Sequence, residues 1–191
     1  YYAAWEKVGV YKRDLLKKKV VAARDEQKEA GQQFKDALTR LKELYGFDGG
    51  KLEATYTALQ KDYDRSAAKA EKVRGRIKDV ESVAGDLFAE WEKEIKQISS
   101  PVLQQSSRSQ LDATRQRYDA LHAALKQAER SLGPVLIQFH DQVLYLKHNL
   151  NAQAIASLKG EAAGIQTEID RLIKEMNTSI ARADEFIKEL H

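Results

Sequence analysis

The sequence contains no cysteine, only two prolines and ten glycines, and no long apolar run. Without cysteine, the chain has no disulfide, no cysteine-ligated metal centre and no thiol nucleophile. No run approaches the roughly 18 apolar residues that indicate a membrane-spanning helix. Because residues that favour turns are scarce, the elements between the turns must be long. These absences favour a fold built from a few long elements.

A strong excess of one charge is also missing. The chain has 32 basic and 29 acidic side chains, which leaves a formal charge of +3. The two signs alternate along every segment, as is typical of solvated helix faces. Two basic clusters interrupt this mixture: Lys12, Arg13, Lys17, Lys18 and Lys19 form the first, and Lys72, Arg74, Arg76 and Lys78 form the second. We interpret both as solvated faces. The second interpretation is that the clusters, and above all the first one, contact an anionic surface. The third is that they bind nucleic acid.

Helix-forming side chains at helical spacing are abundant. Apolar residues recur in alternating steps of four and three, the spacing of a seam between packed helices. The clearest seam consists of Leu52, Tyr56, Leu59, Tyr63, Ser66, Ala70, Val73, Ile77, Val80, Ala84, Leu87 and Trp91. Another runs through Ile155, Leu158, Ala162, Ile165, Ile169, Leu172, Met176, Ile180, Ala183 and Ile187. The pattern predicts an all-α protein with almost no strand.

Short breaks divide the chain into four segments. They lie at Gly46–Gly50, Ser99–Pro101 and Asn149–Asn151. Because short connections make neighbouring helices antiparallel, we expect one elongated domain over residues 1–191, an up-down-up-down four-helix bundle. The predicted helices span about 2–45, 51–98, 108–149 and 152–190. Since proline removes a backbone donor, we expect a kink at Gly133–Pro134. The alternative is that the third segment breaks at Pro134, so that fewer helices pack side by side.

Motifs for catalysis or cofactor binding are missing. None of the four histidines, His122, His140, His148 and His191, follows a Glu by three residues, as the paired motif of di-iron bundles requires. Gly49–Gly50–Lys51 lacks the spacing of a phosphate-binding loop. The many acidic residues fall at the solvent-facing positions of the helical repeat. No pair of carboxylates therefore stands out as a candidate for acid–base catalysis. We therefore predict a non-enzymatic protein with no metal and no cofactor.

The stretch from Asp141 to Glu161 differs from the generic amphipathic pattern. Four apolar residues at Val143–Leu146 are followed by polar residues, and then by small residues spaced four apart. Small residues at this spacing let another backbone approach closely, which indicates packing against Val143–Leu146 or, alternatively, a recognition surface. The predicted interaction surface comprises Tyr145, His148, Asn149, Asn151, Ala156, Gly160 and Gly164.

This stretch, together with Tyr1–Leu16 and Phe47–Gly50, resembles a proteobacterial family of predicted lipoproteins that is described only as a domain of unknown function. The resemblance covers essentially the whole chain. It implies an exported precursor with a lipidated cysteine just ahead of Tyr1, and so a periplasmic, membrane-anchored protein. It brings no catalytic residues to this chain.

We therefore expect a cell-envelope protein, tethered at its N-terminus, that contacts a partner protein or a second copy of itself. The alternative is a nucleic-acid-associated coiled coil that uses the two basic clusters. Nucleic acid is the less favoured partner because acidic residues dilute both clusters.

Overall fold

A computed structural model describes the backbone of residues 2–46 and 52–190, and the side chains from Gly9 onward. Within these ranges the fold is all-α, with no strand. The helices are α1 (Tyr2–Tyr45), α2 (Leu52–Ile95), α3 (Pro101–His148), α4 (Ala152–Gly160) and α5 (Ala162–Glu189). Residues 47–50 of the predicted break at Gly46–Gly50 lie outside the described residues.

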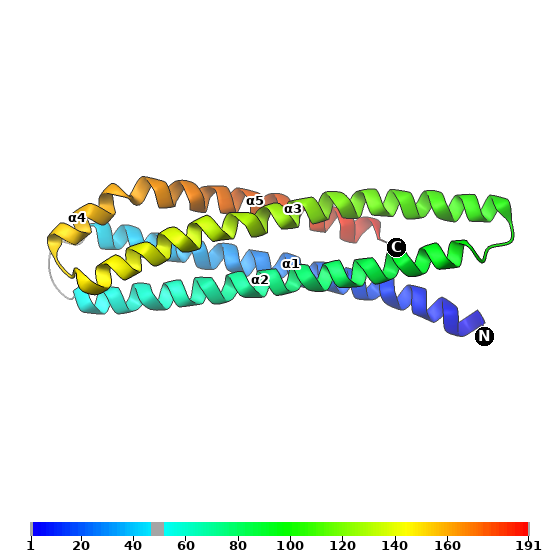
Figure 1. Cartoon of the computed structure of the whole chain (residues 1–191), viewed down its shortest axis with the longest axis horizontal. Coiled ribbons are helices and arrows are strands. Elements are labelled where there is room, and N and C mark those ends of the chain that lie inside the picture. Colours follow the sequence, from blue (N-terminus) through cyan, green and yellow to red (C-terminus); the bar gives the residue numbers. More distant parts are fainter. Residues whose placement is uncertain (1, 47–51, 191) are drawn as a thin grey trace.

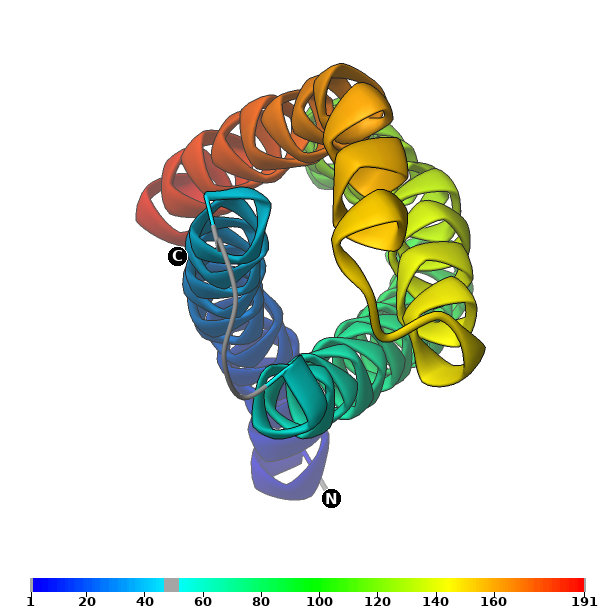
Figure 2. The same ribbon diagram turned by 90° about the vertical axis from the view of Figure 1, so that its left-hand side faces the viewer.

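The four long helices form an elongated antiparallel bundle (Figure 1). Each of them packs against two neighbours, in the cyclic order α1–α2–α3–α5, so that α1 lies across the bundle from α3 (Figure 2). The 44 residues of α1 span about 66 Å at about 1.5 Å per residue. The fold class predicted from the sequence is confirmed.

The predicted seams form the core of this bundle. In α2, the buried apolar seam residues include Ala70, Val73, Ile77, Val80, Ala84 and Leu87, which are at most 3% exposed. In α1, they are Leu16, Val20, Ala23, Ala30, Phe34, Ala37, Leu41 and Leu44. Because each helix presents one apolar stripe and four stripes face the same axis, the core runs along the rod.

The third helix departs from the prediction at its start. It begins at Pro101 rather than near residue 108. The Ser100 side chain accepts a hydrogen bond from the backbone N–H of Leu103, and Pro101 occupies the first turn, where a missing N–H costs nothing. The polar residues predicted as a link therefore form helix. Pro134 lies inside α3, which continues to His148, so the alternative of a break at Pro134 is wrong.

The fourth predicted segment consists of two helices. The division falls at Glu161, between α4 and α5, where the backbone N–H of Glu161 bonds to the carbonyls of Leu158 and Lys159. Ile155 and Leu158 of α4 are buried, and α4 contacts α1, α3 and α5. The short helix thus covers the end of the core that lies away from the N-terminus (Figure 1).

Candidate functional site

The chain turns between α3 and α4 through a short connection held by two asparagines. The Asn149 side-chain amide donates to the carbonyl oxygen of Tyr145 at 2.9 Å. The Asn151 side chain caps α4 by accepting from the backbone N–H of Ala154 at 2.8 Å. We call residues 141–161 the elbow. The two asparagines therefore satisfy free backbone groups at the end of α3 and the start of α4.

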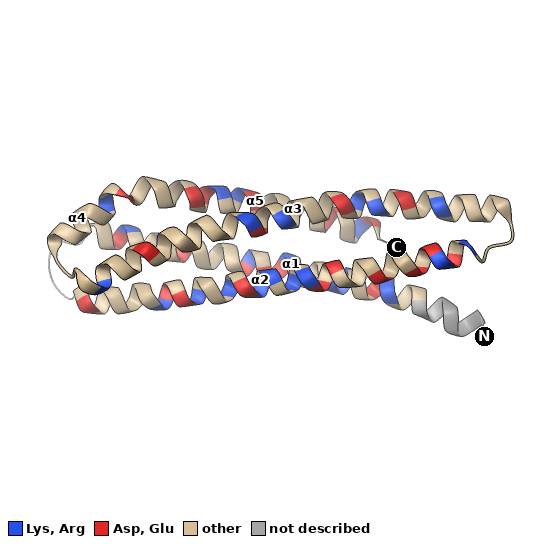
Figure 3. Cartoon of the chain, in the orientation of Figure 1, with Lys and Arg blue, Asp and Glu red and all other residues tan. Residues whose placement is uncertain are grey.

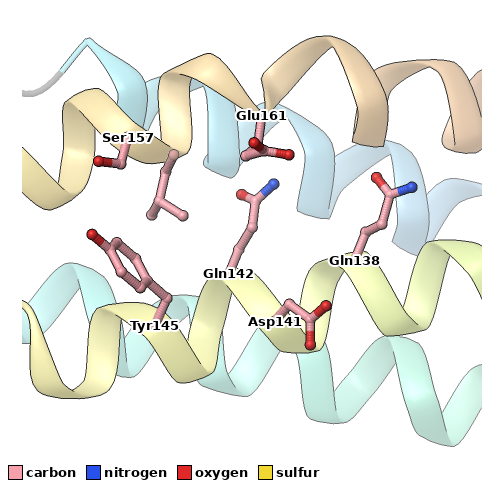
Figure 4. Close-up of a pocket in the computed structure, with 7 residues that line it drawn as sticks. Gln138, Asp141, Gln142, Tyr145, Ser157 and Glu161 are labelled. Atoms are coloured by element: carbon pink, nitrogen blue, oxygen red, sulfur yellow. The ribbon is translucent and has the colours of Figure 1, made fainter.

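A groove runs between the last turns of α3 and the α4–α5 junction (Figure 4). Its volume is about 420 Å³. It is lined by Gln138, Asp141, Gln142 and Tyr145 of α3, Ser157 and Leu158 of α4, and Glu161 at the junction. Gln138, Gln142 and Tyr145 follow one another at steps of four and three, Asp141 is adjacent to Gln142, and Ser157 and Glu161 are four apart, so each wall is one helix face.

Gln142 is the polar residue buried in this groove, with 5% of its surface exposed. The Tyr45 hydroxyl, at the end of α1, donates to Gln142 Oε1 at 2.6 Å. Burial raises the pKa of Tyr45, which keeps the phenol protonated as a donor. Since Oε1 is engaged, the amide has a defined orientation and its Nε2 group remains a donor with no partner among the described residues. Figure 4 shows this amide directed toward Glu161.

The part of the chain that carries the groove is poor in charge and has four exposed apolar side chains; the other exposed large apolar side chains among the described residues are Val10, Tyr11, Val102 and Leu103, at the opposite end of the rod. Ile137, Leu144, Tyr145 and Leu150 are 64%, 48%, 40% and 38% exposed. From residue 133 to residue 166, the only Asp, Glu, Lys and Arg side chains are Asp141, Lys147, Lys159 and Glu161. Figure 3 shows this sparse charge on α4 and the adjoining turns of α3, in contrast to the mixed charge along the middle of the rod.

The predicted surface residues occupy different environments within and beside the elbow. Tyr145 lines the groove, and His148 lies exposed at the end of α3. Ala156 and Gly160 are exposed on α4, and a Cβ atom added at Gly160 would meet nothing within 4 Å. The prediction that the small residues pack against Val143–Leu146 is therefore wrong for Gly160. At Gly164, an added Cβ would lie 3.5 Å from Gln138 Oε1, beside the groove.

Comparison with protein families identifies the chain. A family model described as "Protein of unknown function (DUF2959)" matches residues 1–190. The chain belongs to this family. No curated protein matches it. The family's description names no activity, so the chemistry of the groove has to indicate what binds there.

The first basic cluster lies on α1 and is partly neutralised by α2. Lys12 pairs with Glu90, and Lys19 Nζ lies 3.7 Å from Asp79. The Arg13 guanidinium lies 4.7 Å from the centre of the Trp91 ring. Lys17 and Lys18 are exposed.

The second basic cluster, on α2, is diluted in the same way. Arg74 pairs with Glu71 on its own helix. Arg76 Nε lies 4.0 Å from Glu26 on α1. These ion pairs reduce the positive charge that the cluster presents to a partner.

Sequence patterns missed the polar residues that are buried. Asp62 is 1% exposed and pairs with Arg40, and Glu26 is 9% exposed. The prediction that acidic residues occupy solvent positions is wrong for both. The sequence pattern also does not distinguish the polar groove residues Gln138, Gln142, Ser157 and Glu161, although Gln142 directly precedes the seam residue Val143.

Among the described residues, no group of three His, Asp or Glu side chains could hold a metal ion. No described helix is long and apolar enough to cross a membrane.

Proposed function

We propose that this chain is a non-enzymatic, partner-binding rod of the cell envelope, tethered ahead of Tyr1, whose elbow is the contact surface. The observation that carries the proposal is the groove at the α4 end of the bundle, which combines the buried amide of Gln142 with the exposed apolar side chains of Leu144, Tyr145 and Leu150. The N-terminus of α1 lies at the other end (Figure 1).

Exposed apolar side chains beside a charge-poor groove favour an interaction surface. Single exposed apolar residues are ordinary on proteins, but contiguous apolar surface with little charge is characteristic of interfaces. Ile137 and Leu144 are seven residues apart and share one face of α3, and Tyr145 is next to Leu144. A helical protein without need of a partner would be expected to carry charged residues at these exposed positions.

The length of the rod supports a role in reaching a partner. Helix α1 spans about 66 Å from its N-terminus to the end of the bundle that α4 covers. A lipid anchor just ahead of Tyr1, as the family resemblance implies, would hold the elbow at about this distance from the membrane. A charge-poor contact surface at that distance suits a partner in the envelope or a second copy of the chain.

The competing function, association with nucleic acid, depends on different residues. Lys17 and Lys18 on α1 are exposed and favour it, whereas the ion pairs of Lys12 and Lys19 weaken it. Binding through such a cluster would weaken steeply with salt, because it releases counterions. Contact through the elbow would depend little on salt.

Site-specific photo-crosslinking in cells tests the contact surface. A photoreactive residue replaces Leu144 at the elbow or, for comparison, Val102 at the opposite end of the rod, where Val102 and Leu103 are also exposed apolar residues. We expect a discrete adduct with a partner or a second copy from position 144 and none from position 102. Equal adducts at both positions, or none at 144, would contradict the proposal.

The tether has a separate test. Cells producing the native precursor are fractionated, and the intact mass of the mature N-terminus is measured. We expect a lipid-modified cysteine in the membrane fraction. An unmodified chain in the cytosol would remove the envelope from the proposal and make salt-dependent nucleic-acid binding the next assay.

A further inference from the structure

We propose that the groove between α3 and the α4–α5 junction binds a polyhydroxylated ligand, a sugar unit of a glycan. This inference rests on the proposed function, because it names the chemical class of partner that the same end of the rod recognises. A volume of about 420 Å³ falls within the roughly 300–1,000 Å³ usual for small-ligand pockets.

The donors and acceptors of the groove match hydroxyl groups. Gln142 is 5% exposed, and its Nε2 group is a donor because Tyr45 engages its Oε1. Glu161 supplies an acceptor toward which this amide is directed, and no hydrogen bond joins the two in the described chain (Figure 4). A hydroxyl group can both donate and accept, so one such group can satisfy Gln142 and Glu161 together. Gln138 adds a second amide with both functions.

The charge of the groove selects against anionic ligands. Asp141 and Glu161 line it, and no Lys or Arg does. A phosphate or carboxylate ligand would therefore meet negative charge without a compensating base. A dedicated cation site is also disfavoured, because Figure 4 shows the Asp141 carboxylate directed away from Glu161.

The groove offers one apolar patch rather than the series of apolar anchors that a hydrophobic peptide needs. Leu158 and the ring of Tyr145 are its apolar contributors, and they lie among amide, hydroxyl and carboxylate groups. A helical peptide bound in a groove needs several apolar anchors spaced along one face. A sugar ring needs only one aromatic or aliphatic surface for its C–H groups, with polar side chains around its rim.

NMR titration of the whole chain tests the assignment. The probes are two neutral trisaccharides, one of glucose and one of N-acetylglucosamine, and the readout is the side-chain amide signals of Gln138 and Gln142. We expect saturable shifts with at least one trisaccharide, and affinity about tenfold weaker in Glu161→Gln, because an acceptor loses its charge. Glu161 makes no side-chain cap, so this substitution leaves the helix junction intact. Glu175→Gln, on α5, is the matched control.

A second pair of variants tests whether the ligand occupies the groove itself. Gly164→Leu places a side chain beside Gln138 and should abolish the shifts, whereas Gly75→Leu, with nothing within 4 Å, should preserve them. Absence of saturation with both trisaccharides up to about 10 mM would overturn the proposal. Stronger shifts with the cationic peptide tri-lysine would also overturn it, because the groove would then recognise positive charge rather than hydroxyl groups. If sugars fail while the crosslinks from position 144 persist, only the ligand class is wrong and the proposed function stands.

Discussion

The hydroxyl of Tyr45 and the side-chain amide of Gln142 form a buried hydrogen bond of 2.6 Å between the end of α1 and the last turns of α3. The two helices otherwise lie across the bundle from each other (Figure 2). The bond therefore links opposite helices where α4 covers the core. It also fixes which side of the Gln142 amide faces the groove, so stability and recognition depend on the same contact.

Tyr45→Phe should destabilise the bundle by about 1–2 kcal/mol, because it leaves Gln142 Oε1 buried without a donor. Urea denaturation followed by circular dichroism measures the change. Tyr56→Phe is the control: its hydroxyl lies 3.4 Å from Gln60 Oε1 in a partly buried position, and we expect a loss below about 0.5 kcal/mol. Equal losses of stability in the two variants would show that the buried hydrogen bond contributes no more to stability than the partly buried one.

Ile77→Asp should unfold the bundle or lower its stability by several kcal/mol. Ile77 is 1% exposed in the α2 seam, and a carboxylate there would be buried without a partner. Ala68→Asp adds the same charge at an exposed position of α2 and should change stability by less than about 0.5 kcal/mol. Thermal melting distinguishes them, and a wild-type melting temperature for Ile77→Asp would refute the seam assignment.

Arg40→Ala should cost about 2 kcal/mol, because it removes the cation that pairs with Asp62. Asp62 is 1% exposed, and its second carboxylate oxygen has no hydrogen bond, so the remaining charge would be poorly compensated. Adding Asp62→Asn removes that charge and should recover part of the loss. Denaturant titration of the two single variants and the double variant measures this coupling. Additive losses would mean that the pair contributes nothing to stability.

The sequence predicted the long helices well because burial at alternating steps of four and three is a direct consequence of helical geometry. Its limit appears in α5. The apolar pattern predicts that Ile180 follows Met176 in the buried seam. In the structure, Ser179 is buried instead (0% exposed) and Ile180 is half-buried. The same displacement puts Phe186 (2% exposed) rather than Ile187 in the core. The direction of the stripe, and not the polarity of one residue, decides which side chain is buried.

The groove could not be predicted in the same way. The sequence indicated the elbow through its small residues and asparagines, but Gln142 and Glu161 come together only because the chain turns between α3 and α4. The amide orientation depends on Tyr45, which is 97 residues from Gln142. Sequence periodicity reports which face of a helix is buried, and it carries no information about which distant polar group completes a contact.

Tyr118 should ionise at about pH 12. Burial among Phe88, His122 and Phe186 raises the pKa of Tyr118 to about 12, and the charges of Glu81 and Asp119 act in the same direction. The unfolded chain ionises this phenol near pH 10. The folded state favours the neutral form, so its contribution to stability is complete below about pH 10 and is lost as the pH rises to about 12. The tyrosinate absorbance of the wild type minus that of Tyr118→Phe isolates this titration, and a midpoint near pH 10 would contradict it.

The combined variant Asn149→Ala and Asn151→Ala separates the structural role of the elbow from recognition. Loss of the Asn151 cap should cost about 1 kcal/mol, and the change in helicity should not exceed the nine residues of α4. The four long helices keep their core, so circular dichroism should remain close to that of wild type. We expect the crosslink from position 144 and the trisaccharide shifts to weaken together, because α4 carries Ser157 and Leu158 and is followed directly by Glu161. Asn177→Ala, at an exposed position of α5, is the control and should alter neither readout. If the double variant retained both interactions at wild-type strength, the angle between α3 and α4 would have no part in forming the contact surface.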